Sequence, residues 1–230
     1  ALQAHVNVSR VQVKNGHQAI NSDKLAEKWL VSPKVARRTL ERTTQRGVRT
    51  ISNPSLSRRF RTNDRQLRYK RLRHDCFTDT MQAKTKSRRG ELYTQVYATG
   101  FHWSRAYPMK KKSDAHETLS LVFQRDGVPP RMIMDGSKEQ TQGRFKKKCQ
   151  DADCRIKQTE PYSPWQNAAE SAIRELKKAA GRKMVRAGAP KPFWADAIEL
   201  EAYVRSHTAH DIYSLQGEVP ETVMSGETAD

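Results

Sequence analysis

From residue 75 onward the chain has three short strand-like runs in close succession. All three are rich in β-branched and aromatic residues, and they are DCFTDTM at 75–81, ELYTQVYATG at 91–100 and HWSRAYPM at 102–109. Gly100 supplies a turn between the second run and the third. Runs of this composition that are bounded by turn residues predict β-strands. Residues 75–109 are therefore expected to form three strands.

The pattern then changes to helices that alternate with strands. Ser113 or Asp114 can cap a helix that ends at Gly127, and RMIMD at 131–135 predicts a brief apolar strand ending in Asp135. A helix, a strand and two further helices are expected in this order, at 138–149, 154–159, 164–187 and 190–210. Three strands followed by this alternation predict an α/β fold with a mixed sheet and helices on its faces.

The two last helices have apolar faces that can be assigned from spacing. For the first of them, Ser163 is the expected N-cap, Pro164 the first helical residue and Gln166 the partner in a capping box. Its expected buried stripe is Ala169, Ile173, Leu176 and Ala180. Glu170 lies directly beside this stripe, either as a solvated rim carboxylate or as part of an acidic site. The last helix is expected to bury Phe193, Ala197, Leu200 and Val204.

Three acidic residues are candidates for one site at the edge of this sheet. Asp79 falls inside the first strand, Asp135 ends the fourth, and Glu170 lies near a helix start. Strand ends of an open α/β sheet meet where ligands usually bind, and three carboxylates there repel one another unless divalent cations neutralise them. Oxygen ligands suit Mg²⁺ or Mn²⁺, and two such ions about 3.5–4 Å apart can promote phosphodiester chemistry. Asp75 is the alternative first acid, and three unrelated surface acids are the alternative to a site.

Positive charge is concentrated in the first third of the chain. The whole chain has 43 Lys and Arg against 25 Asp and Glu, a net charge of +18, but residues 1–75 alone have 18 against 5. Such a basic block beside a nearly balanced region is typical of nucleic-acid binding. No apolar run is long enough to span a membrane, so no membrane partner is expected. The few, odd-numbered cysteines favour a reducing compartment and buried thiols.

Residues 22–50 predict a small helical unit of the helix-turn-helix type. Leu25 and Trp29 belong to the apolar face of a first helix, and a second helix is capped by Ser32 and ends at Gly47. The second helix carries basic residues that could dock on DNA: Lys34, Arg37, Arg38 and Arg42. A plain three-helix packing unit is the alternative interpretation.

A basic linker is expected to follow this unit. Eight of the sixteen positions from Arg58 to Arg73 are Lys or Arg, and Arg58 and Arg59 are candidates for phosphate contacts that add salt dependence but no sequence preference. A solvated linker is the alternative. The expected organisation is an N-terminal segment of uncertain structure, the helical unit, the linker, an α/β core and a C-terminal extension, at 1–21, 22–50, 51–74, 75–210 and 211–230.

Four motifs within residues 75–230 resemble the integrase core of copia-type LTR retrotransposons, in a divergent branch. They are MDGSKE, YSPWQNAAESAIRELKK, PKPFWADAIELEAY and PETVMSGETAD. The family has an Asp in its first strand, an Asp followed by Gly, and a Gln-Asn…Glu run that opens a long helix; the matching acids here are Asp79, Asp135 and Glu170. Two departures stand out. The 34 residues between Asp135 and Glu170 are one fewer than the commonest spacing. The family's N-terminal module needs two His and two Cys for zinc, and none of His5, His17, Cys76, Cys149 or Cys154 offers that set with usable spacing.

The resemblance implies an RNase H-like fold and a DDE polynucleotidyl transferase. Such an enzyme processes DNA 3′ ends and transfers them into host DNA, in the nucleus after a cytoplasmic particle stage, and works as a homo-oligomer. Asp79, Asp135 and Glu170 would hold two Mg²⁺ or Mn²⁺ ions. A catalytically inactive integrase-derived DNA-binding protein and a cut-and-paste DDE transposase are the alternative functions.

DNA contacts are expected on the helix that carries Glu170. Arg174 and Lys177 lie four and seven residues after Glu170, on one helix face, and are predicted to grip donor DNA. A surface ion pair between Arg174 and Glu170, worth at most about 0.5 kcal/mol, is the alternative. Further predicted DNA contacts lie in the family motifs, at Lys138, Gln166 and Asn167. Helix capping and turn formation are the competing roles for the last two.

Overall fold

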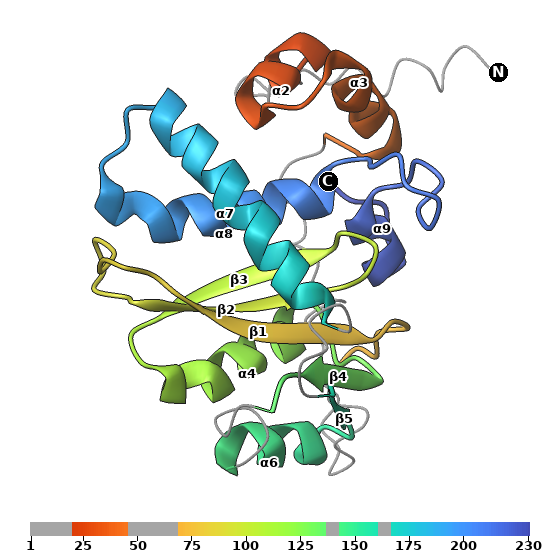
Figure 1. Cartoon of the computed structure of the whole chain (residues 1–230). Coiled ribbons are helices and arrows are strands. Elements are labelled where there is room, and N and C mark those ends of the chain that lie inside the picture. Colours follow the sequence, from red (N-terminus) through yellow and green to blue (C-terminus); the bar gives the residue numbers. More distant parts are fainter. Residues whose placement is uncertain (1–19, 46–68, 137–142, 161–166) are drawn as a thin grey trace, which may run out of the picture.

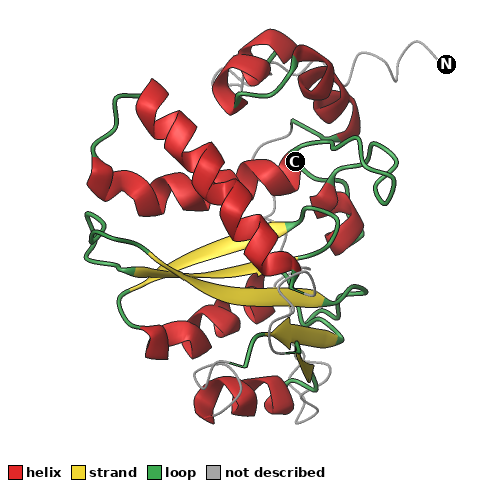
Figure 2. Ribbon diagram, viewed as in Figure 1, coloured by secondary structure: helices red, strands yellow, loops and turns green. Residues whose placement is uncertain are grey.

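A five-stranded mixed sheet is the centre of the molecule. The computed structural model describes residues 20–45, 69–136, 143–160 and 167–230. The described strands are β1 (Cys76–Gln82), β2 (Tyr93–Ala98), β3 (Ser104–Met109), β4 (Arg131–Met134) and β5 (Arg155–Gln158). Their order across the sheet is β3-β2-β1-β4-β5, with β1, β2 and β3 antiparallel and both β1–β4 and β4–β5 parallel. Helices lie on both faces (Figures 1 and 2), which confirms the predicted α/β architecture.

Helices α7 (Ala168–Arg186) and α8 (Trp194–His207) cover one face of the sheet. Side chains alternate across a strand, so every second residue of the central strands faces these helices. Met81 and Val96 are buried on this face against the apolar side of α7. The predicted stripe of α7 is buried as expected, at Ala169, Ile173, Leu176 and Ala180.

Helices α4 (Ala115–Arg125) and α6 (Gly143–Asp151) pack on the opposite face. Tyr97, which follows Val96 on β2, is fully buried in this second core, and its hydroxyl is 2.8 Å from the hydroxyl of Thr118. The predicted buried thiols are confirmed, since all three cysteines are free and buried: Cys76, Cys149 and Cys154. Among the residues that the structure describes, no helix combines the length and the apolar character needed to cross a membrane.

The boundary of α7 and the buried face of α8 differ from the predictions. Asn167 has an extended backbone and is the N-cap of α7, so the helix begins at Ala168 and not at Pro164. The predicted N-cap Ser163 lies outside the described residues. Val204 is buried as predicted, but Phe193 and Leu200 are 42% and 50% exposed. The inward side of α8 also includes Ala195, Ile198, Glu201 and Ala202.

The N-terminal helical unit consists of α2 (Ser22–Trp29) and α3 (Pro33–Arg42). Ser32 caps α3 as predicted, because its hydroxyl accepts the Val35 N–H at 3.3 Å. The helix ends at Arg42 and not at Gly47, since Thr43 already has an extended backbone. The remaining short elements are η4 (Lys112–Asp114), η6 (Lys191–Phe193) and α9 (Pro220–Ser225).

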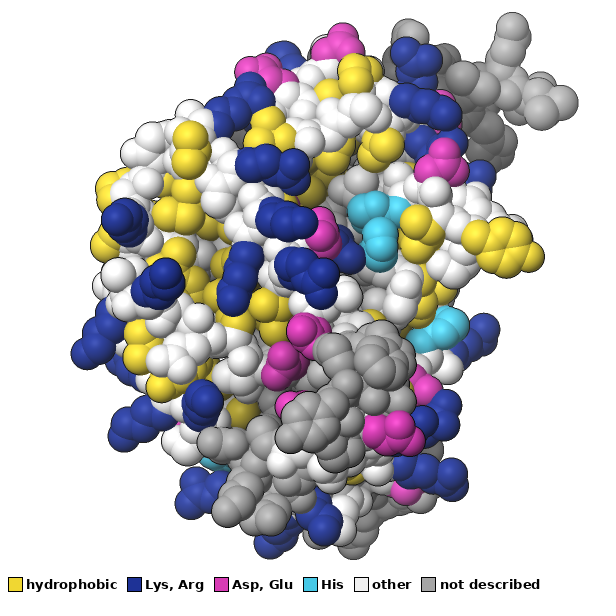
Figure 3. All heavy atoms as spheres, in the orientation of Figure 1, with side chains coloured by type: hydrophobic (Ala, Val, Ile, Leu, Met, Phe, Trp, Pro, Cys, Tyr) yellow, Lys and Arg dark blue, Asp and Glu magenta, His cyan; other side chains and the backbone are white. Residues whose placement is uncertain are grey.

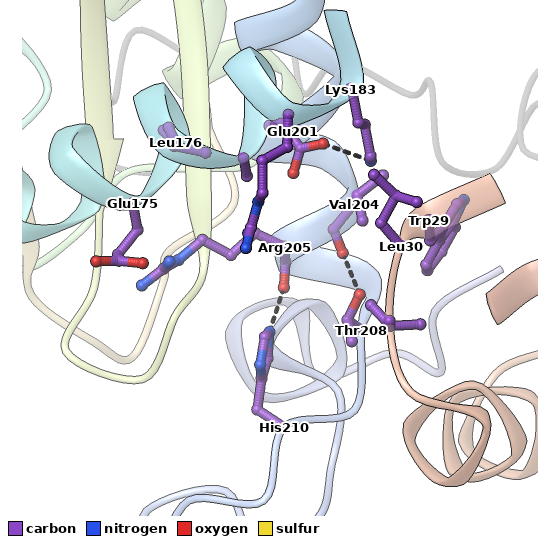
Figure 4. A pocket seen from close by; sticks show the side chains of 13 residues that line it. Trp29, Leu30, Glu175, Leu176, Lys183, Glu201, Val204, Arg205, Thr208 and His210 are labelled. Atoms are coloured by element: carbon purple, nitrogen blue, oxygen red, sulfur yellow. Dashed lines mark hydrogen bonds and ion pairs between the residues drawn. The ribbon is translucent and has the colours of Figure 1, made fainter. Parts of the chain in front are cut away.

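Helix α3 packs against the C-terminal part of the chain. The Thr39 hydroxyl accepts the buried N–H of Ala209 at 2.9 Å, and Arg38 pairs with Asp211 at 3.1 Å. A cavity of about 160 Å³ lies between α2, α7 and α8. The buried ion pair of Lys183 with Glu201 lines this cavity (Figure 4).

Candidate active site

The register of two parallel strands brings Asp79 and Asp135 side by side. Thr78 on β1 pairs with Met134, the last residue of β4. Asp79 directly follows Thr78, and Asp135 directly follows Met134. Because neighbouring strands lie about 4.7–4.9 Å apart, the two aspartates occupy equivalent positions on adjacent segments. The strand β4 ends one residue before Asp135, so Asp135 leaves the sheet directly from the strand end.

Helix α7 places Glu170 over the same part of the sheet. Phe77 and Met81 lie on either side of Asp79 on one face of β1, and both pack against α7, Phe77 beside Ala169 in its first turn. Asp79 therefore faces the start of α7, where Glu170 is exposed in the first turn. Figure 3 shows acidic side chains in this region, with Lys and Arg side chains along the surface above them.

Electrostatics connects the three predicted acids. Burial raises the pKa of Asp79 above its ordinary value, and the negative charges of Asp135 and Glu170 raise it further. Two groups act in the opposite direction on this pKa: the Thr80 N–H, which donates to Asp79 Oδ1 at 2.7 Å, and the positive charge of Lys177. The three acids thus share one electrostatic neighbourhood, although they come from β1, the end of β4 and α7.

The donor atoms in this neighbourhood fit a hard divalent cation. Three carboxylates supply oxygen ligands. Burial raises the pKa of Asp79, and the negative charges of Asp135 and Glu170, which a cation would neutralise, raise it further. Asp135 Oδ1 accepts the Gly136 N–H at 2.6 Å, which orients this carboxylate. The described residues contain no group of three or more His, Cys, Asp or Glu side chains already gathered closely enough to hold a metal ion.

Comparison with known proteins relates this fold to retroviral integrases. No protein-family model and no curated protein sequence matches the chain. A chain of the simian T-cell lymphotropic virus intasome in complex with PP2A regulatory subunit B56 gamma superimposes with a TM-score of 0.56 at 14% identity, covering 88% of this chain and 72% of that one. The catalytic core domain of BIV integrase gives 0.50 at 16% identity, covering 66% and 93%. This is the fold of a retroviral integrase catalytic core.

A further structure, the HTLV-2 integrase catalytic core domain in complex with magnesium, gives a TM-score of 0.48 at 12% identity, covering 66% of this chain and 95% of that one. At 14% and 16% identity, the two similarities above show the integrase core fold and no more. Site residues, activity and metal use in this chain rest on its own geometry and sequence.

Within this integrase core fold, Asp75 and Asp79 have different surroundings. Asp75 precedes β1 and pairs with Arg131, whose Nε donates to Asp75 Oδ1 at 3.0 Å. Burial instead raises the pKa of Asp79, and the negative charges of Asp135 and Glu170 raise this pKa further. These surroundings favour Asp79 as the first acid, which stays a prediction.

The predicted DNA contacts on α7 meet two different outcomes. Among the described side chains, neither Arg174 nor Lys177 forms an ion pair, so the surface pair proposed as the alternative for Arg174 and Glu170 is not formed. Asn167 is 5% exposed and its side-chain oxygen accepts the Ala169 N–H at 3.0 Å, which supports the capping role for this residue.

The other predicted DNA contacts lie mostly outside the described residues, at Arg58, Arg59, Lys138 and Gln166. On α3, Arg37 is exposed, whereas Arg38 is occupied by its ion pair with Asp211. A direct contact of Arg37 with DNA therefore stays a prediction. Arg38 could contact DNA only after its ion pair with Asp211 is broken.

Asp79→Asn is expected to stabilise the metal-free protein and to abolish its stabilisation by Mg²⁺. The substitution keeps an oxygen that can accept the Thr80 N–H. It removes a partly buried negative charge that is repelled by the carboxylates of Asp135 and Glu170. We expect a rise in Tm of about 2–4 °C at neutral pH, as for a gain of about 1 kcal/mol.

The gain in Tm expected for Asp79→Asn depends on pH, because it requires that Asp79 is ionised in the wild-type protein. The folded state holds the Asp79 proton more tightly than the unfolded chain does, so wild-type Asp79 is unfavourable only where it is ionised. The Tm difference should shrink as the pH falls toward the ordinary aspartate range, near 4. Thermal scans in EDTA and in Mg²⁺ measure both effects; a lower Tm for Asp79→Asn at neutral pH would contradict the prediction.

Sequence analysis missed one feature beside this site, an open groove between the connection after β1 and helices α7 and α8. Its lining includes Lys84, Lys177, Lys191 and Trp194. No single periodic pattern marks such a groove, because its residues come from three separate segments. The sign in the sequence is the occurrence of lysines next to apolar residues in each of these segments.

Proposed function

We propose that this chain is the catalytic region of a retroelement integrase, a metal-dependent polynucleotidyl transferase that processes DNA 3′ ends and joins them to host DNA. The observation that carries the proposal is the common electrostatic neighbourhood of Asp79, Asp135 and Glu170 in a chain with an integrase core fold. The copia-type motifs around these residues support assignment to that group of retroelements.

In this proposal Asp79, Asp135 and Glu170 would hold two Mg²⁺ or Mn²⁺ ions. When bound, the ions would activate the attacking oxygen and stabilise the leaving oxygen of a phosphodiester. The protein residues position the ligands: the Thr80 and Gly136 N–H groups orient the two aspartates. Water and then a DNA 3′-hydroxyl are the nucleophiles, so no side chain has to form a covalent intermediate.

The proposed partners are the element ends, the host target DNA and further copies of this chain, and the proposed site of action is the nucleus. Basic residues beside the acids would balance the phosphate charge of the donor strand. Arg174 and Lys177 are the residues of α7 that we assign to this contact, since both are exposed and lack carboxylate partners among the described residues.

Arg174→Ala and Lys177→Ala are each expected to weaken binding of duplex DNA and to reduce the salt dependence of the affinity by about one phosphate contact. Lys178→Ala is the matched control, because Lys178 lies on the same helix but pairs with Glu175 at 3.5 Å. Fluorescence anisotropy at several salt concentrations gives the slope. An equal change of slope in Lys178→Ala would mean that α7 contributes only general positive charge.

Strand joining tests the proposed function directly. The protein is mixed with labelled donor ends, a target plasmid and Mg²⁺ or Mn²⁺, and joined products are separated on a gel. We expect joined products that require the metal. DNA binding without any joining would favour the alternative, a catalytically inactive integrase-derived DNA-binding protein.

A further inference from the structure

The groove beside the candidate site has an apolar lining and a basic rim. Its volume is about 550 Å³, and it lies between the connection after β1, the second half of α7 and the start of α8, at the left of Figure 1. Buried or half-buried apolar side chains line it: Met81, Ala180, Met184, Trp194 and Ile198. Three exposed lysines surround this lining, Lys84, Lys177 and Lys191. We call these residues the lysine groove.

The walls of the lysine groove are fixed by hydrogen bonds. Trp194 Nε1 donates to the Thr85 carbonyl at 2.9 Å, which holds the indole against the connection after β1. The Arg88 N–H donates to the Pro192 carbonyl at 2.8 Å and ties the same connection to the segment before α8. The groove is therefore formed by the folded chain itself, which reduces the cost of ordering it around a ligand.

The charge around the lysine groove is not compensated by the protein. In the described part of the chain, no carboxylate pairs with Lys84, Lys177 or Lys191. Nearby acids are already occupied by arginines; Asp196, for example, pairs with Arg88 at 3.0 Å. A ligand for this surface must carry negative charge and must also present an apolar face.

An unpaired nucleotide meets both requirements, and a DNA duplex does not. A duplex presents its phosphates outward and hides the faces of its bases in the stack, whereas an unpaired base can stack on an aromatic side chain while lysines bind its phosphates. Trp194 supplies the aromatic surface. The groove volume lies within the roughly 300–1,000 Å³ of small-ligand sites, which suits one or two nucleotides.

The position of the groove connects it with the carboxylates. Met81 lies two residues after Asp79 on the same face of β1, a separation of about 7 Å. Lys177 lines the groove and its charge also lowers the pKa of Asp79. We propose that the lysine groove binds unpaired nucleotides of the DNA strand whose phosphodiester lies at Asp79, Asp135 and Glu170, so that the enzyme prefers frayed or tailed ends. This inference rests on the proposed function, since it assumes DNA at the three carboxylates.

Binding measurements in EDTA test the lysine groove without requiring catalysis. Three labelled probes share one duplex: a blunt end, a two-nucleotide tail, and a tail of the same length that lacks bases. We expect the wild-type protein to bind the tailed probe about tenfold more tightly than the blunt one, within the range of a single base–aromatic stack. The tail without bases should recover only a small part of this gain, because it keeps the phosphates and loses the stacking.

Variants separate the groove from general positive charge. Met184→Asp, which places a negative charge in the apolar lining, should remove most of the preference for the tail. Lys84→Ala combined with Lys191→Ala should remove only the smaller part that the phosphates contribute. Lys146→Ala combined with Lys147→Ala removes the same number of charges from exposed positions of α6 and should weaken binding of all three probes equally. Circular dichroism checks that each variant is folded.

Two results would overturn the inference. Equal affinity of the wild-type protein for the tailed and blunt probes would exclude the groove as a nucleotide site, even if strand joining is observed. Equal loss on all three probes in the groove variants would reduce the lysines to a general phosphate-binding patch. Failure of the proposed function is recognised separately, as strand joining that is absent or insensitive to the three acids.

Discussion

Asp135→Asn is expected to lower strand joining by at least about 10³-fold, the largest effect we predict on activity. Asparagine has nearly the same shape and can still accept the Gly136 N–H that Asp135 accepts at 2.6 Å. What it loses is the negative charge needed to bind a divalent cation next to Asp79. Labelled donor ends incubated with Mg²⁺ and a target plasmid measure the loss, and DNA binding in EDTA should stay within about twofold of wild type.

Asp75→Asn is the matched control for this substitution. Asp75 is also an aspartate close to β1, but its carboxylate pairs with Arg131 and has no place among the three acids. Joining by Asp75→Asn should therefore stay near the wild-type level, with a small loss of stability from the exposed pair. Normal joining by Asp135→Asn would remove the catalytic assignment, and loss of joining in Asp75→Asn alone would transfer the role of first acid to Asp75.

The strands and their alternation with helices could be predicted because they depend on local composition. CFTDTMQ, YTQVYA and SRAYPM combine β-branched or aromatic residues with bounding turns, and they form β1, β2 and β3. The pairing order could not be derived in the same way. β1 lies between β2 and β4, and its parallel pairing with β4 is a contact between distant segments that no local pattern encodes.

The buried face of α8 shows why periodicity alone was insufficient. Apolar residues occur on several sides of this helix, so the spacing of Phe193, Ala197, Leu200 and Val204 was compatible with one face. The structure buries Val204 as predicted but leaves Phe193 and Leu200 exposed, and the buried face includes the charged Glu201 and the polar Ser206. A buried charge is rare unless it is paired, and the partner of Glu201 is Lys183 on a different helix. Its position depends on tertiary packing.

The candidate site was predictable in its residue types and not in its arrangement. Asp79, Asp135 and Glu170 were chosen for their positions at a strand, a strand end and a helix start. Their common neighbourhood depends on the parallel register of β1 with β4 and on the packing of Phe77 and Met81 under α7. The helix begins at Ala168 and not at the predicted Pro164, because Asn167 has an extended backbone and its side chain caps the first turn.

Lys183→Ala is expected to lower the free energy of unfolding by about 3–5 kcal/mol, the largest effect we predict on stability. The side chains of Lys183 and Glu201 are only 13% and 8% exposed, and they pair across α7 and α8 at the cavity beside α2 (Figure 4). Alanine leaves the Glu201 carboxylate buried without a counter-charge. Among the described side chains, Lys183 is the cation that pairs with Glu201. Urea unfolding measures the change, and the Tm should fall by about 10 °C.

Two further variants distinguish a lost ion pair from a lost side chain. Lys178→Ala removes a lysine of the same helix that pairs with Glu175 at the surface, where the two side chains are 64% and 51% exposed. This substitution should lower the free energy of unfolding by less than about 0.5 kcal/mol. Lys183→Met combined with Glu201→Met should recover most of the loss, because apolar side chains of similar length can replace a buried ion pair at little cost. If the double variant is as unstable as Lys183→Ala, packing of the lysine stem and not its charge stabilises the contact between α7 and α8.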